Sequence, residues 1–214
     1  MEEVRYYFLI IIAAVGIIFC HIIDTTKSFF EALTQASFQV ASIITTTGFS
    51  SVDFNKWSQT CKTVLVFLMF CGACAGSTGG GIKVSRILIL CKTVRKELHI
   101  FLHPNAIKKI KMDGKAIPHE VVRSTNIFFI VYMLIFASSI FLIAFDDFNL
   151  ITNFTAVAAT FNNIGPGLEL VGPTGNFGMF SWFSKLILTF DMLAGRLEIF
   201  PLLILFVRDT WKKF

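Results

Sequence analysis

Charged residues are scarce in this sequence. Lys, Arg, Asp and Glu make up 15% of the 214 residues, whereas soluble domains carry about 25%. The hydrophobic share is 55%, above the roughly 45–50% that is usual for soluble proteins. This composition argues against a soluble enzyme domain, and its abundance of apolar residues excludes an intrinsically disordered chain. We therefore expect an integral membrane protein, for which this length allows about four to six spans.

Cysteine and histidine are also few, and neither forms a recognisable site. The five cysteines lie in or beside apolar segments, and an odd number argues against a disulfide scaffold. Cys71 and Cys74 form a C-x-x-C pair without a nearby histidine, so packing is the favoured interpretation. The four histidines share no metal-ligand spacing. A membrane enzyme using these cysteines would need a catalytic base that we do not find, so we predict a protein that is not an enzyme and binds no organic cofactor.

Four long apolar stretches are present, and two shorter ones lie between them. The first has 20 residues and no cleavage site after it, which predicts a true span rather than a signal peptide. The shorter segments, 28–44 and 150–161, have the length of re-entrant or buried helices. The long stretches are 4–23, 60–91 with a break at a glycine cluster, 125–145 and 182–207.

The sequence contains an internal repeat. The run 41–48 parallels the run 158–165 at an offset of 117 residues, and each run ends in a polar, glycine-containing turn. Repeats within a membrane chain usually assemble around a shared axis, where the site lies. We predict an all-α membrane fold of two units, each with an outer helix, a re-entrant helix, a turn and an inner helix. The units would cover residues 1–91 and 125–214, with turns at 45–49 and 162–167 and a basic connection at 92–124.

The distribution of charge predicts the orientation in the membrane. Residues 83–115 hold nine Lys and Arg against two acidic residues, a local net charge of +7. A basic block can bind nucleic acid, but one flanked by apolar runs is typical of a cytoplasmic loop. Residues 146–181 contain no Lys or Arg but include Asp146, Asp147 and Glu169. Both turns would then face outward beneath an acidic mouth, which concentrates cations.

The two turns have the composition of an ion filter. Non-helical backbone is tolerated at membrane depth only where it is buried in protein or lines water. A glycine allows the unusual backbone angles that direct successive carbonyls toward one axis, and rings of carbonyls replace the hydration shell of potassium. One Thr-rich turn alone would be unremarkable, but two equivalent turns after two short helices favour the filter interpretation.

A glycine cluster and an arginine are candidates for a gate. The cluster at 76–81 lacks the lysine of a phosphate-binding loop, because Ile82 stands in its place. We predict a flexible break that lies across the pore beneath the filter, with a kinked helix as the alternative. Arg196 lies within an apolar stretch, where its insertion costs about 2.5–3.5 kcal/mol. Asp191 and Glu198 are not at the spacing that shares its helix face, so Arg196 either faces the pore or pairs with a neighbouring unit.

Three motifs together resemble those of the potassium uptake proteins of the Trk/Ktr/HKT superfamily, most closely the bacterial TrkH type. They are Thr45-Thr46-Thr47-Gly48-Phe49, Gly76-Ser77-Thr78-Gly79-Gly80-Gly81-Ile82-Lys83 and Asn162-Asn163-Ile164-Gly165-Pro166-Gly167. The resemblance implies four such units around one pore, of which this chain supplies the third and fourth, and K⁺ as the transported ion. It implies filter positions at Thr46, Thr47, Gly48, Phe49, Asn163, Ile164, Gly165 and Pro166, and gating by Gly76, Ser77, Thr78, Gly79, Gly80, Gly81 and Arg196.

The same resemblance implies partners and a location. Such proteins are homodimers in the bacterial inner membrane, controlled by a cytoplasmic nucleotide-binding subunit of the TrkA type. Two units make half a ring, so the chain is a fragment, or a separate chain supplies the first half, or two copies close one pore. The alternative is a non-conducting assembly subunit or truncated fragment of such a transporter. Selectivity for K⁺ over Na⁺ stays open, because the first-unit filter position lies outside this sequence.

Overall fold

The computed structural model describes residues 1–26, 28–104, 109–197 and 199–204, and helices dominate it. Among these residues the exception to the expected all-α architecture is one antiparallel hairpin. Its strands have two residues each, β1 (Lys111–Met112) and β2 (Lys115–Ala116). Short 3-10 turns are η1 (Phe54–Lys56), η2 (Ala144–Asp146), η3 (Glu169–Val171) and η4 (Phe177–Met179). The α-helices are α1 (Glu2–Ile22), α2 (Phe29–Ile44), α3 (Gln59–Cys71), α4 (Val84–Leu102), α5 (His119–Ile143), α6 (Leu150–Phe161), α7 (Trp182–Leu197) and α8 (Ile199–Ile204).

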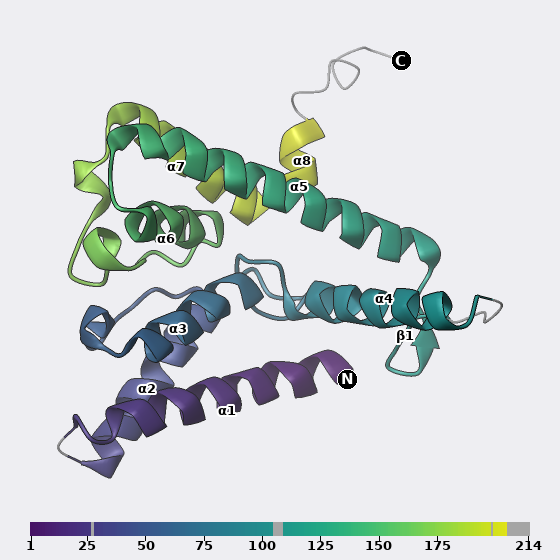
Figure 1. Cartoon of the computed structure of the whole chain (residues 1–214), viewed down its shortest axis with the longest axis horizontal. Coiled ribbons are helices and arrows are strands. Elements are labelled where there is room, and N and C mark those ends of the chain that lie inside the picture. The colour runs from purple at the N-terminus through teal and green to yellow at the C-terminus, as the bar shows by residue number, and fades with distance from the viewer. Residues whose placement is uncertain (27, 105–108, 198, 205–214) are drawn as a thin grey trace.

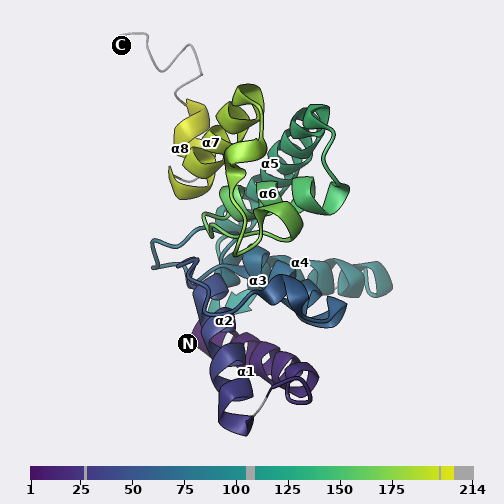
Figure 2. The same cartoon turned by 90° about the vertical axis from the view of Figure 1, so that its left-hand side faces the viewer.

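The helices form two groups that lie one above the other (Figures 1 and 2). In the first group α1 packs on α2 and α3, and in the second α5 packs on α6 and α7. The contact between α3 and α6 joins the groups, and α4 lies against both α1 and α5. The hairpin and the carboxyl end of α4 lie at one end of the long axis, away from the loops that follow α2 and α6 (Figure 1).

The helix boundaries reflect the sequence repeat. α1 begins at residue 2 and α5 at residue 119, while α2 ends at residue 44 and α6 at residue 161. Both pairs are therefore separated by the 117 residues that relate the two sequence runs. Each half of the chain, α1–α4 and α5–α8, therefore begins with a long helix followed by a short one. The long helices start, and the short helices end, at equivalent positions of the repeat.

The boundaries around the basic connection differ from those expected. The helix that follows the glycine loop continues to Leu102, so the expected connection at 92–124 begins with a helical segment. α5 likewise begins at His119 instead of residue 125. The reason is local: residues 84–102 contain no glycine or proline to stop a helix, whereas Pro118 precedes the first turn of α5, where proline is tolerated.

The break between α3 and α4 is also wider than the glycine cluster. It covers residues 72–83, because Gly72 ends α3 with a positive φ of +61°, which favours glycine. A Cβ atom at Gly72 would overlap the carbonyl oxygen of Gly80, so the loop folds closely back on its own start. The expected last helix, 182–207, is described as α7 and α8, while Glu198 and residues 205–207 lie outside the described residues.

Two of the described helices have the length and composition of membrane spans. They are Glu2–Ile22, with a mean hydropathy of 2.0, and His119–Asp146, with 2.7. Large apolar side chains such as Phe8, Ile12 and Phe141 are exposed on them. Soluble monomers rarely expose wide apolar patches, so this surface suits contact with lipid or with further protein.

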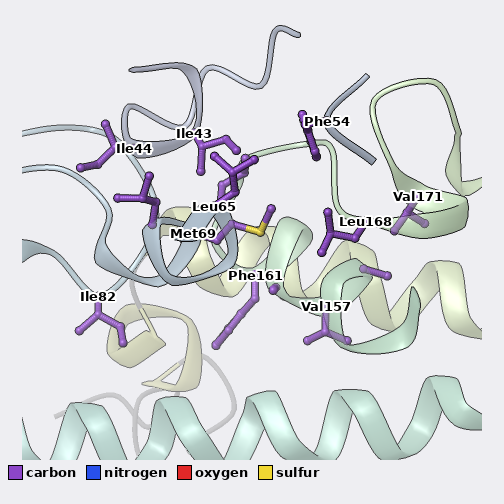
Figure 3. Close-up of a cluster of buried hydrophobic side chains, with 14 of the residues drawn as sticks. Ile43, Ile44, Phe54, Leu65, Met69, Ile82, Val157, Phe161, Leu168 and Val171 are labelled. Carbon is purple, nitrogen blue, oxygen red and sulfur yellow. The ribbon is translucent and has the colours of Figure 1, made fainter. Parts of the chain in front are cut away.

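The hydrophobic core lies beside the ends of α2 and α6. Figure 3 shows Ile43 and Ile44 of α2 near Leu65 and Met69 of α3, with Phe161 of α6 on the other side. These side chains are almost fully buried. The core therefore fixes the points at which the two short helices end and the two glycine-containing turns begin.

Candidate ion pathway

The first turn follows α2 and has a defined hydrogen-bond pattern. The Thr46 amide donates to the carbonyl of Ile43 over 3.0 Å, and the Thr47 amide donates to the carbonyl of Ser42 over 2.9 Å. The Ser42 hydroxyl donates in turn to the carbonyl of Phe49 over 2.6 Å. These bonds fold residues 45–49 back along the end of α2.

The second turn repeats this pattern at positions 117 residues further along. The Asn163 amide donates to the carbonyl of Thr160 over 3.0 Å, and the Ile164 amide donates to the carbonyl of Ala159 over 2.8 Å. The buried Tyr132 hydroxyl of α5 donates to Asn162 Oδ1 over 2.8 Å. The predicted equivalence of the two turns thus extends to their individual backbone hydrogen bonds.

Both turns hold a non-glycine residue in the left-handed region. Thr46 has φ +56° and Asn163 has φ +54°, and each is followed two residues later by a glycine at positive φ, Gly48 or Gly165. A β-branched residue such as Thr rarely adopts this conformation. Backbone strain of this kind persists only where the surroundings enforce it, and it concentrates at functional sites.

The two turns are in direct contact. A Cβ atom at Gly48 would overlap the carbonyl oxygen of Ile164, and Pro166 Cδ would lie 3.3 Å from it. Ile164 is buried, whereas Gly165 is exposed. Phe49 is 71% exposed, so its side chain contributes little to this contact. Of the predicted filter positions, the structure thus brings Gly48 of the first turn against Ile164, Gly165 and Pro166 of the second.

Both short helices end at these turns, which affects the local electrostatics. Each helix macrodipole places a partial negative charge, roughly half an elementary charge, at its carboxyl end. The carboxyl ends of α2 (Ile44) and α6 (Phe161) therefore both favour cations at the turns. The loops that follow the turns also carry acidic residues, among them Asp53 and Glu169.

The glycine loop lies against both turns. A Cβ atom at Gly79 would come within 3.2 Å of Thr46 Oγ1, and one at Gly80 would overlap the carbonyl oxygen of Asn162. A Cβ atom at Gly76 would meet nothing within 4 Å. The part of the cluster that lies close to the turns is therefore the second, around Gly79 and Gly80. The second part of the loop therefore contacts both turns, and its expected course across a pore beneath them stays a prediction.

Arg196 reaches the same loop from α7. Its Nη1 donates to the carbonyl oxygen of Thr78 over 2.6 Å. The neighbouring Gly195 lets α7 approach α6, because a Cβ atom there would overlap the carbonyl oxygen of Phe161. Asn163 of the second turn donates to the carbonyl of Met192 in α7 over 3.1 Å. α7 therefore holds both the second turn and the glycine loop.

A cavity of about 290 Å³ lies where the loop, α4, α5 and α7 meet. Its lining includes the loop residues Ser77 and Thr78 and the basic side chains of Lys83, Arg86 and Arg196. The Arg86 guanidinium lies 4.0 Å from the centre of the Phe128 ring, a cation–π contact. Three basic side chains, from the end of the loop, from α4 and from α7, therefore line one cavity.

Comparison with known proteins shows the family of this chain. Residues 4–213 match the TrkH family, described as cation transport proteins. The chain belongs to the TrkH family. It is 40% identical to the Trk system potassium uptake protein TrkH of Salmonella typhimurium over 208 residues, covering 96% of this chain and 41% of that protein. Against the TrkG protein of Escherichia coli the identity is 33%, covering 98% of this chain and 43% of the relative.

A solved TrkH structure has the same fold. The crystal structure of the potassium transporter TrkH from Vibrio parahaemolyticus superposes with a TM-score of 0.88 at 38% identity, covering 98% of this chain and 45% of that one. The chain thus spans less than half the length of these TrkH relatives. The family resemblance expected from the three motifs is confirmed, and the relatives are transporters rather than enzymes by name.

Several residues that contact the two turns, the loops after them or the glycine loop were not predicted from the sequence. Tyr132 holds Asn162 from a different helix, and Asn55 exchanges two hydrogen bonds of 3.0 Å with the backbone of Glu169 across the two halves. Glu3 contacts the glycine loop from α1. A tyrosine within an apolar span signals a buried polar partner, but no local pattern identifies Asn55 or Glu3. Among the described residues no group of three metal-ligating side chains occurs, and Cys71 and Cys74 are free thiols.

Proposed function

We propose that this chain forms two of the four units of a potassium transport pathway of the TrkH type. The observation that carries the proposal is the pair of turns. They share their hydrogen bonds and their left-handed residues at an offset of 117 residues, and they touch at Gly48 and Ile164. The relatives of this chain are named potassium uptake proteins, which supports K⁺ as the transported ion.

In this proposal the turns coordinate K⁺ through their backbone. Carbonyl oxygens of Thr46, Thr47, Gly48 and Phe49 act with those of Asn163, Ile164, Gly165 and Pro166, replacing water around the ion. The helix ends at Ile44 and Phe161 add a negative partial charge. The strained conformations of Thr46 and Asn163 set the carbonyl directions before the ion arrives, so little reorganisation is needed on binding.

The gate in this proposal is the loop formed by Gly76, Ser77, Thr78, Gly79, Gly80 and Gly81, together with Arg196. The bond from Arg196 to the Thr78 carbonyl supports a closed loop beneath the turns. The positive charge of Arg196 at the cavity raises the energy of a cation there. Opening requires the loop and the Arg196 side chain to move away from the axis.

A complete ring requires two further units. The chain spans 41–45% of its relatives' length, so we propose that the remaining units come from residues outside this sequence, from a separate chain or from further copies. The assembly would lie in the bacterial inner membrane as a homodimer of complete pores. Its basic cytoplasmic side, which includes α4 and the hairpin, would contact a nucleotide-binding regulatory subunit of the TrkA type.

Substituting Gly48 tests the filter. Gly48→Ser adds a Cβ atom that overlaps the Ile164 carbonyl and disfavours the φ of +80°. In a complete assembly this variant should reduce the preference for rubidium over sodium in uptake by vesicles. The matched control is Gly16→Ser, where a Cβ atom meets nothing within 4 Å. Unchanged selectivity in folded Gly48→Ser would show that Gly48 does not line the filter.

A further inference from the structure

Glu3, in the first turn of α1, contacts both ends of the glycine loop. Its Oε1 accepts a hydrogen bond from the Ala75 amide over 2.7 Å and from the Ser85 amide over 3.2 Å. Ala75 lies in the loop before the glycine cluster, and Ser85 is the second residue of α4. A single carboxylate oxygen therefore joins the two sides of the break.

The chemistry of this contact favours a charged acceptor. The amides in the first turn of a helix lack partners within that helix, and the positive end of the helix dipole attracts a carboxylate. Hydrogen bonds to an ionised acceptor are shorter and roughly twice as strong as neutral ones. Glu3 is half-buried, so water weakens these bonds only in part.

A second charged residue holds carbonyl oxygens of the same loop. Lys83 Nζ donates to the carbonyl oxygen of Ala75 over 3.3 Å and to that of Ser77 over 3.2 Å. Arg196 holds the next carbonyl, that of Thr78. The Glu3 carboxylate thus holds one amide of the loop backbone, and the side chains of Lys83 and Arg196 hold three of its carbonyl oxygens.

The first turn of α1 is itself anchored. Glu2 forms an ion pair with Lys92 of α4, and Lys92 Nζ also donates to the carbonyl oxygen of Lys111 in β1 over 2.7 Å. The side chains of Glu2 and Lys92 are 36% and 25% exposed. Because α1 is fixed to α4 and to the hairpin next to Glu3, the Glu3 carboxylate has a defined position relative to the loop.

We propose that Glu3 is a positioning residue for the gate: it holds the glycine loop beneath the turns by joining Ala75 to the start of α4. This inference rests on the proposed gating role of the loop. It assigns part of the control of that loop to α1, an outer helix that lines neither turn. Losing the carboxylate should free the loop while leaving the two turns in place.

Hydrogen–deuterium exchange tests the contact without relying on transport. The chain in lipid nanodiscs is compared with Glu3→Ala and Glu3→Gln, and the peptide covering residues 72–86 is followed by mass spectrometry. We expect about tenfold faster exchange in Glu3→Ala, since two hydrogen bonds to a charged group are lost. Glu3→Gln keeps a neutral oxygen acceptor and should show a smaller increase.

The matched control removes a carboxylate elsewhere. Glu31 in the first turn of α2 accepts from Gln35 of its own helix over 3.2 Å, so Glu31→Ala should leave the loop peptide unchanged. Unchanged exchange at residues 72–86 in Glu3→Ala would overturn the proposal. So would an equal increase in peptides of α5 and α6 in both Glu3 variants, because the effect would then be general unfolding.

Rubidium uptake by the complete assembly separates this inference from the proposed function. Faster loop exchange together with increased uptake in Glu3→Gln supports both the positioning role and the gate. Faster loop exchange with unchanged uptake supports the positioning role of Glu3 and contradicts gating by residues 76–81. The two claims therefore fail on different measurements.

Discussion

At the scale of single residues, the site depends on backbone conformations that side chains normally resist. Thr46 and Asn163 both adopt positive φ, at a cost of roughly 1–2 kcal/mol each. The hydrogen bonds of each turn and the buried core beside Ile43 and Phe161 offset this cost. The same backbone conformation in two unrelated residue types, at equivalent positions, indicates that the fold of the turns requires it whichever side chain is present.

Glycine at 195 is required by close helix packing. A Cβ atom there would overlap the carbonyl oxygen of Phe161 and lie 2.9 Å from Asn163 Nδ2. Gly195→Ala should therefore push α7 away from the second turn and lower the stability by about 1–3 kcal/mol. The measurement is a thermal unfolding curve of the chain in detergent.

Gly16→Ala is the control for that substitution. Gly16 lies within α1, and a Cβ atom there meets nothing within 4 Å. Replacing a helix-interior glycine by alanine should stabilise the chain by roughly 0.5–1 kcal/mol. If Gly195→Ala were as stable as Gly16→Ala, the close approach of α7 to α6 would be wrong.

At the scale of elements, the two halves are joined near the exits of the turns. Asn55, within η1, donates to the carbonyl oxygen of Glu169 and accepts from its amide, both over 3.0 Å. Glu169 begins η3 in the other half and has φ +53°. This pair fixes the loop after the first turn to the loop after the second.

Replacing Asn55 should loosen this connection. Asn55→Ala removes both hydrogen bonds at a partly exposed position, so we expect a loss of about 1–2 kcal/mol. Asn55→Asp keeps the acceptor but loses the donor, and its loss should be at least half as large. Thermal unfolding measures both, with Thr34→Ala as control because the Thr34 hydroxyl donates within its own helix. Equal stability of all three variants would contradict the role of Asn55.

The sequence predicted elements better than contacts between them. The long and short helices 4–23, 28–44 and 150–161 were located to within a few residues, because hydrophobic length and flanking polar turns are local signals. The break at residues 72–83 was placed too narrowly, because Gly72 lies ahead of the glycine cluster. The start of α5 was missed because its first turn is polar.

Contacts across the chain were beyond sequence reasoning. Glu3 and Ala75 are 72 residues apart, and Asn55 and Glu169 are 114 apart. No periodicity relates such pairs, since they meet only when helices pack. The close approach of Gly48 to Ile164 is of the same kind: the repeat predicted two equivalent turns, but only the packed structure brings them into contact.

At the scale of the whole molecule, the exposed surface is that of a part rather than of a closed ring. Phe49 beside the first turn is 71% exposed and Phe67 of α3 is 68% exposed. The chain spans under half the length of these relatives, and under the proposed function such surfaces would contact the units that complete the pore. Contact with lipid would account for the exposed apolar residues of α1 and α5, but not for an exposed residue beside the turn.

Rubidium-86 uptake by a chimaera tests the central claim most directly. This chain would replace the matching 45% of the Vibrio parahaemolyticus potassium transporter TrkH, so that all four units are present in one polypeptide, and the purified protein would be placed in liposomes with sodium as competitor. We predict uptake that potassium blocks and sodium does not, with the preference reduced by Gly48→Ser. Correctly inserted chimaera without uptake, or with uptake that ignores Gly48→Ser, would contradict the claim that these two turns form half of a potassium filter.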